Sequence, residues 1–142
     1  MSDAEVTSAR LETAPGERFL HLRETLGIRG FGANLIALQP RQRGRMHRHL
    51  RQEEVYVVLD GELTLALDGE ERTYGAREIV RVPPIVRRQL MNRGNVPTVL
   101  LALGCSGDHT TTGPDGIGWA SWDDTGEGQA PRDLPAPTDL PD

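Results

Sequence analysis

The sequence predicts an all-β protein, built as an antiparallel sandwich or barrel of short strands. From residue 31 onward, short apolar or alternating segments follow one another with turn residues between them. Two Asp-Gly pairs, at 60–61 and 68–69, separate such segments. This pair is a strong hairpin signal, because both central residues of the tight turn need a positive φ. Regularly spaced short strands with intervening turns are typical of sandwiches and barrels.

Each strand is expected where apolar residues run or alternate up to a turn signal. In "ELTLAL", the leucines at 63, 65 and 67 share one face, which is the period of a half-buried strand. The segment 18–28, "RFLHLRETLGI", fits either a short helix or an edge strand. The expected strands are 31–38, 54–59, 62–67, 78–83, 86–92 and 98–104.

The chain of 142 residues is expected to form one domain with two polar ends. Residues 1–18 form a polar arm, 19–122 a barrel domain and 123–142 an acidic tail rich in Pro and Gly. The tail holds six acidic residues against Arg132 alone, a difference that equals the formal charge of the whole chain, −5. With few large apolar residues, the tail is expected to be disordered or loosely draped. Trp119 and Trp122 are expected to anchor the preceding loop to the barrel or to a partner subunit.

Composition excludes several classes of function. No apolar run approaches the roughly 20 residues of a membrane span, and the start of the chain has no signal-peptide pattern. The single cysteine, Cys105, favours a reduced, cytoplasmic compartment, and 16 arginines with no lysine indicate a GC-rich prokaryote. Residues 41–51 hold five arginines, but the neutral body and 4% aromatic content argue against nucleic-acid binding. We expect those arginines to pair with acids elsewhere.

Two histidines and a carboxylate stand close together in "HRHLRQEEVYVVLDG". Side chains at i and i+2 of a strand share a face, so His47 and His49 project side by side. Glu54 lies an odd number of positions further on, so the intervening residues must turn before it opens the next strand. Two imidazoles and one carboxylate are a common donor set for a divalent metal. Tyr56 shares the face of Glu54 and is expected to line the pocket.

This stretch resembles the first conserved motif of the cupin superfamily: His-x-His, four residues, Glu, six residues, Gly. His47, His49, Glu54 and Gly61 occupy the four positions. The resemblance covers about residues 31–104. It implies a single cupin double-stranded β-helix, a jelly-roll barrel with a pocket at one mouth, and it implies a homodimer that binds a small molecule.

The second cupin motif resembles "REIVRVPPIVRRQLMN" less closely. Pro83 and Asn92 match it, whereas Arg77 and Ile85 replace its two glycines and Arg88 replaces its histidine. In cupins that histidine completes a four-ligand metal site. A guanidinium group cannot take this role, because it has no lone pair to donate and stays charged.

Two arrangements of the site follow. In the first, His47, His49 and Glu54 bind Fe, Mn, Ni or Zn, while Arg88 swings away or clamps an anionic substrate. The resemblance then leaves oxygenase, isomerase and decarboxylase reactions open. In the second, Arg88 points inward and pairs with Glu54, and the pocket binds a small anion without a metal.

Two further histidines lie outside the motifs. His21 and His109 are expected on the surface, and either is an alternative source of a fourth ligand. No organic cofactor is expected.

Overall fold

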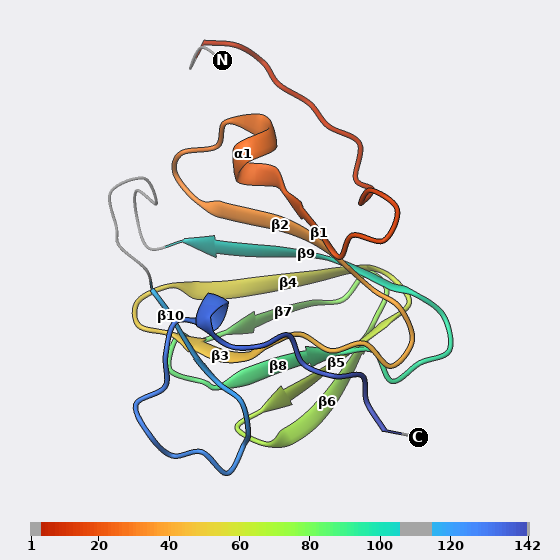
Figure 1. Cartoon of the computed structure of the whole chain (residues 1–142). Coiled ribbons are helices and arrows are strands. Elements are labelled where there is room, and N and C mark those ends of the chain that lie inside the picture. Colours follow the sequence, from red (N-terminus) through yellow and green to blue (C-terminus); the bar gives the residue numbers. More distant parts are fainter. Residues whose placement is uncertain (1–3, 106–114, 142) are drawn as a thin grey trace.

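The computed structural model describes residues 4–105 and 115–141 as two five-stranded antiparallel sheets (Figure 1). One sheet has the order β1-β2-β9-β4-β7 and the other β10-β3-β8-β5-β6. The first consists of β1 (Phe19–His21), β2 (Gly32–Leu38), β9 (Thr98–Cys105), β4 (Glu53–Asp60) and β7 (Ile79–Val82). The second consists of β10 (Gly116–Trp119), β3 (Met46–His49), β8 (Arg88–Met91), β5 (Glu62–Leu67) and β6 (Glu70–Gly75). The expected jelly roll is therefore confirmed, and all six expected strands are present, five with shifted ends and 62–67 with its expected ends.

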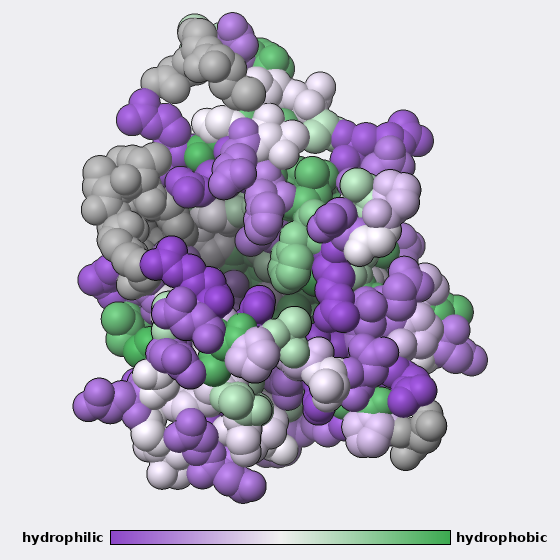
Figure 2. Space-filling view, viewed as in Figure 1, coloured by the Kyte–Doolittle hydropathy of each residue, from purple (hydrophilic) through white to green (hydrophobic). Residues whose placement is uncertain are grey.

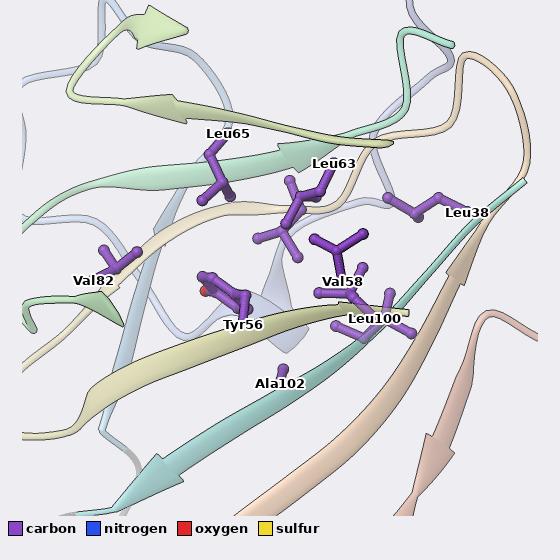
Figure 3. Packing of buried hydrophobic residues seen from close by; sticks show 10 residues of the cluster. Leu38, Tyr56, Val58, Leu63, Leu65, Val82, Leu100 and Ala102 are labelled. Atoms are coloured by element: carbon purple, nitrogen blue, oxygen red, sulfur yellow. The ribbon is translucent and has the colours of Figure 1, made fainter. Parts of the chain in front are cut away.

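The main core lies between the sheets and is built from alternate residues of their strands. Figure 3 shows Tyr56 and Val58 of β4 facing Leu63 and Leu65 of β5, with Leu100 of β9 beside them. All five are at most 1% exposed. Full burial of an aliphatic side chain of this size contributes about 1.5–3 kcal/mol, so these side chains hold the two sheets together.

The second Asp-Gly pair forms the expected hairpin, and the first does not. Asp68 and Gly69 have φ values of 50° and 90° and join β5 to β6, as the turn type requires. The pair at 60–61 instead joins β4 to β5, which belong to different sheets. Only Gly61 takes a positive φ there, 71°. A Cβ at Gly61 would lie 2.3 Å from the carbonyl oxygen of Pro97, so this corner excludes any side chain.

The segment 18–28 contains both of the structures that its pattern allowed. β1 forms the edge of its sheet, and the five-residue helix α1 (Leu22–Leu26) follows at once. Leu22 is buried against Ala33 and Leu35 on the outer face of that sheet. Within the described residues, no helix has the length and hydropathy of a membrane span.

The C-terminal segment is draped over the barrel in its described part, which ends at residue 141 (Figure 1). Two leucines anchor it: Leu134 and Leu140 are 6% and 4% exposed. A short 3₁₀ helix, η1 (Pro131–Asp133), precedes them. Before this segment, the expected tryptophan loop contains the strand β10, and Trp119 is 5% exposed under the guanidinium of Arg87.

Candidate metal centre

The candidate site lies between the two sheets, because each sheet supplies part of it. His47 and His49 come from β3, and Glu54 comes from β4 of the opposite sheet. Their ligand atoms all lie within 4.8 Å of one another. The three side chains are 20%, 15% and 15% exposed, so the group is accessible but largely shielded from water. The sequence predicts this convergence, and the structure has it.

The turn that carries the chain from β3 to β4 is held by Asp115. Its carboxylate accepts hydrogen bonds of 3.0 Å from the backbone N–H groups of both Arg51 and Gln52. Asp115 is 6% exposed and directly precedes β10, which pairs with β3. A residue far along the chain thus fixes the reversal that brings Glu54 in front of the histidines.

The outer ring nitrogen of each histidine faces an acceptor. Nδ1 of His47 lies 2.9 Å from the carbonyl oxygen of Arg45, which only accepts, so this nitrogen carries the hydrogen. Nδ1 of His49 lies 3.3 Å from Oδ2 of Asp115, a close approach without hydrogen-bond geometry in the described structure. In its neutral form, His47 then turns the lone pair of Nε2 toward Glu54. Such outer partners orient the histidine ligands of metal sites and raise their basicity.

One carboxylate oxygen, Oε1 of Glu54, is the centre of the group. Tyr56 Oη donates to it at 2.6 Å and Arg88 Nη1 at 3.0 Å, while Nε2 of His49 and of His47 lie 3.1 and 3.4 Å away. Burial raises the pKa of Glu54, but the two histidines outweigh it: in their protonated form they donate hydrogen bonds to the carboxylate and carry positive charge, which brings this pKa well below 4.5. Glu54 is therefore an anion at neutral pH.

Arg88 points inward and is fully buried. Besides Glu54, it donates through Nη2 to the carbonyl oxygens of Pro83 and Pro84, at 2.6 and 3.4 Å. Arg88 thus has the inward position, paired with Glu54, that the second arrangement expects. Burial raises the pKa of Tyr56 well above 10.0, as does the charge of Glu54, whereas Arg88 lowers it. Tyr56 is a neutral hydrogen-bond donor to the carboxylate.

The donor set fits a divalent metal ion by its chemistry and its spacing. Bonds of about 2.0–2.1 Å place adjacent ligand atoms about 2.9–3.4 Å apart in octahedral and tetrahedral sites. The separations of Glu54 Oε1 from Nε2 of His49 and His47, 3.1 and 3.4 Å, fall in this range. Both ring nitrogens of His49 are buried and make no hydrogen bond to the described residues.

Two cavities meet at the site. The larger, about 500 Å³, reaches from His47, His49 and Glu54 to an apolar wall that includes Ile36 and Leu38. The smaller, about 280 Å³, shares His49 and Glu54 and opens toward α1. Figure 2 shows a hollow near the middle of this face, with hydrophilic residues around its rim and hydrophobic residues deeper inside.

Comparison with known proteins agrees with this architecture. The family model of the cupin domain matches residues 34–104, half of the chain. The chain belongs to the cupin family. This cupin is 32% identical over 56 residues to an uncharacterised protein of Methanocaldococcus jannaschii, a match that spans 39% of this chain and 45% of that protein.

Solved cupin structures resemble the fold. A sugar phosphate isomerase of the cupin superfamily from Silicibacter pomeroyi is 26% identical with a TM-score of 0.60, over 71% of this chain and 62% of that one. A putative sugar phosphate isomerase from Acidithiobacillus ferrooxidans is also 26% identical, with a TM-score of 0.57 over 62% and 58%. A cupin protein from Bacteroides fragilis, 20% identical with a TM-score of 0.63, covers 80% and 91% and shows the fold alone. This cupin thus spans less than two thirds of the length of the archaeal protein and of both isomerases.

The remaining candidate residues have different places in this cupin. His21 lines the smaller cavity, where its Nδ1 lies 3.0 Å from Oδ1 of Asn34, and it does not join the ligand group. His109 lies outside the described residues. Sequence reasoning missed Asp115, because nothing near it in the chain marks it as a partner of His49 or of the turn. Three of the five arginines of 41–51 donate to backbone carbonyls of the C-terminal segment, and Arg51 lies 3.6 Å from Asp115.

Proposed function

We propose that this cupin binds a divalent metal ion through His47, His49 and Glu54 and acts on a small anionic molecule in the larger cavity. One observation carries the proposal: two imidazole Nε2 atoms and a carboxylate oxygen converge, while the Nδ1 atoms of both imidazoles face acceptors. When both imidazoles are neutral, their two Nε2 lone pairs and the carboxylate oxygen face one another, and a cation between them would relieve the repulsion. A bound metal would act there as a Lewis acid toward an oxygen of the ligand.

The protein's own residues hold this centre and leave one side of it open. Arg88 and Tyr56 donate to Glu54 and fix the position of its carboxylate. Three protein ligands leave coordination positions free, which is typical of catalytic rather than structural metal sites. The isomerases that resemble this chain favour, among the open reactions, a proton-transfer reaction on a small phosphorylated or otherwise anionic substrate.

Metal analysis tests this proposal. Protein purified without chelator is analysed by inductively coupled plasma mass spectrometry, beside the variant His47→Ala. We expect close to one equivalent of Fe, Mn, Ni or Zn in the wild type and its loss in the variant. His21→Ala is the matched control, because His21 lines the neighbouring cavity outside the ligand group. Metal-free wild-type protein whose thermal stability is unchanged by EDTA or by added metal would refute the proposal.

The second arrangement, a metal-free pocket for a small anion, has one observation in its favour. Arg88 already neutralises Glu54 at 3.0 Å, so the site is electrically satisfied without a dication. The guanidinium of Arg88 would also lie close to a metal bound at Glu54, and the repulsion between the two cations would weaken metal binding. In this case the same analysis finds no metal, and His47→Ala leaves ligand binding nearly unchanged.

We also propose that two copies associate through the outer face of the sheet that contains β4. In register across this face lie Ile79, Val57 and Leu101, with Val55 and Leu103 in the next row. Ile79 is 67% exposed, and contiguous apolar surface of this kind marks interaction sites. Sedimentation should give a dimer for the wild type and a monomer for Ile79→Arg. Ile85→Arg, at an exposed position outside these rows, should remain dimeric.

A further inference from the structure

We propose that Arg18, Arg43 and Arg45 form an anion subsite in the larger cavity, and that this subsite binds the phosphate group of the ligand. The inference deepens the proposed function. It depends on that function only for the metal centre, which would contact the other end of the ligand. The three arginines line the same cavity as His47 and Glu54. A ligand bound there therefore meets two chemically different surfaces.

Two separate segments bring the arginines together. Arg43 and Arg45 lie two positions apart just before β3, and Arg18 directly precedes β1. Nη1 of Arg18 donates to the carbonyl oxygen of Arg43 at 3.1 Å, which ties the two segments to each other. All three side chains are partly buried, so their charges are less screened than those of fully exposed arginines.

The positive charge of this cluster is not neutralised by acids. In the described part of the chain, none of the three guanidinium groups forms an ion pair with a carboxylate. Other arginines do so, as in the pair of Arg93 with Glu71 at 2.6 Å. Glu54 is the only carboxylate among the described residues that line the cavity, and Arg88 neutralises it.

The acceptors that Arg43 and Arg45 have among the described residues are neutral groups of the C-terminal segment, and Arg43 also donates through Nη2 to the hydroxyl of Thr138 at 3.3 Å. Arg43 donates through Nε to Thr138 at 2.8 Å, and Arg45 donates through Nη2 to Leu134 at 3.3 Å. These bonds use only part of the donors, since each guanidinium has five N–H groups. Nε of Arg45 is buried and makes no hydrogen bond within the described part of the chain. A charged oxygen makes a stronger hydrogen bond than a carbonyl does, so an anion is the preferred partner for the remaining donors.

A phosphate monoester fits this cluster better than a carboxylate does. It is a dianion near neutral pH with three acceptor oxygens, and planar guanidinium groups bind such oxygens in a bidentate way. The apolar wall beside the cluster, which includes Phe19 and Ile36, suits a short carbon chain. The cavity of about 500 Å³ lies in the usual range for small-molecule sites. The ligand is thus a small phosphate monoester with an oxygen function at its other end.

Calorimetric titration with inorganic phosphate tests the subsite on full-length, EDTA-treated protein. We expect saturable binding to the wild type that is weakened at least tenfold in the double variant Arg43→Gln/Arg45→Gln. Arg41→Gln is the matched control. Arg41 also holds the C-terminal segment, through two hydrogen bonds to the carbonyl oxygen of Leu140, but it does not line the cavity. It should bind phosphate within twofold of the wild type.

Several results would overturn the subsite. These are an absence of saturable phosphate binding to the wild type, equal affinity in the double variant, and an equal loss in Arg41→Gln, which would assign the arginines to tail anchoring alone. Acetate that binds as tightly as phosphate would overturn the phosphate assignment. If the double variant does not fold, the arginine Nε–H resonances of the wild type decide. Those of Arg43 and Arg45 should shift on phosphate addition, and unshifted resonances would refute the proposal.

The titration separates the subsite from the metal centre, because it uses metal-free protein. If phosphate binds but the purified protein contains no metal, the subsite is supported and the metal centre is refuted. If metal binds but phosphate does not, the metal centre is supported and the subsite is refuted.

Discussion

The substitution Arg88→His should convert the three-ligand site into a four-ligand site. Arg88 is the register partner of His47 across β3 and β8, so a histidine at this position starts from the strand next to an existing ligand. Side chains directly opposite each other on neighbouring strands have Cβ atoms about 4.5–5.5 Å apart, within reach of a common ion. We expect the affinity for Zn²⁺ to rise at least tenfold, which is about 1.4 kcal/mol.

The expected gain in Zn²⁺ affinity has two sources: the added imidazole ligand and the removal of the repulsion between Arg88 and the ion. Nη1 of Arg88 lies 3.0 Å from Oε1 of Glu54, so an ion bound to this oxygen sits within about 5 Å of the guanidinium. A dication and a monocation at that distance repel by about 6–7 kcal/mol at an effective dielectric constant of 20. The charge of Glu54 offsets much of this, so the tenfold gain is a lower bound. Loss of the donor to Pro83 and Pro84 lowers the free energy of unfolding by about 1–3 kcal/mol instead.

Competition with a chromogenic chelator measures the affinity at fixed pH and ionic strength. Thermal unfolding of the metal-free variant shows separately whether it folds. The double variant Arg88→His/His47→Ala is the control, because it returns the site to three ligands and should lose most of the gain. A folded Arg88→His protein with unchanged or weaker Zn²⁺ affinity would refute the reasoning, since neither relief of repulsion nor the new ligand would then act on the ion.

The other predictions concern the β4–β5 turn at Gly61, the charge of Glu54 and the contact of Asp115 with His49. Gly61→Ala should lower the free energy of unfolding in urea by more than about 1 kcal/mol, because a Cβ would lie 2.3 Å from the Pro97 oxygen. Gly69→Ala, also at positive φ but with nothing within 4 Å of the added carbon, should lose less, and equal losses would rule out the contact. In metal-free protein, the lowered pKa of Glu54 means that the unfolded chain binds its proton first as pH falls below 4.5, so stability falls there. Glu54→Gln should remove this part of the acid dependence, seen in urea titrations across that pH range. Asp115→Asn should weaken Zn²⁺ binding about 10–100-fold in the chelator assay, and unchanged affinity would show that His49 needs no such partner.

Local pattern was sufficient for six of the strands but not for all of them, nor for their assignment to sheets. Alternation at 62–67 and the pair at 68–69 specify a hairpin within a few residues, and the structure has it. The pair at 60–61 has the same local signal, yet β4 and β5 separate into opposite sheets because each gains its partners from distant strands. β10 was missed for a related reason. Its residues show no alternation, and it is a strand because β3 pairs with it.

For the site, spacing specified which residues meet but not how the rest of the chain supports them. The positions of His47, His49 and Glu54 relative to strand and turn were enough to predict their convergence. The direction of Arg88 stayed open, because it depends on acceptors in the preceding loop. The composition of the C-terminal segment predicts little ordered structure, because it holds few large apolar residues. Composition cannot show that two buried leucines and three arginine–carbonyl hydrogen bonds attach this segment to the barrel.

From the charges of the cavity we expect an anionic ligand whether or not a metal is bound. Without a metal, the pair of Arg88 with Glu54 is neutral, and the guanidinium groups of Arg18, Arg43 and Arg45 remain uncompensated by acids. With a dication, the same wall becomes more positive. A partly enclosed cavity of one sign concentrates the field of its charges and attracts counter-ions. A cationic or neutral ligand would leave the positive charge of the cavity unbalanced in both arrangements, whereas an anion would neutralise it in both. Metal analysis therefore decides only whether the end of the anion away from the arginines contacts a metal ion or the pair of Arg88 with Glu54.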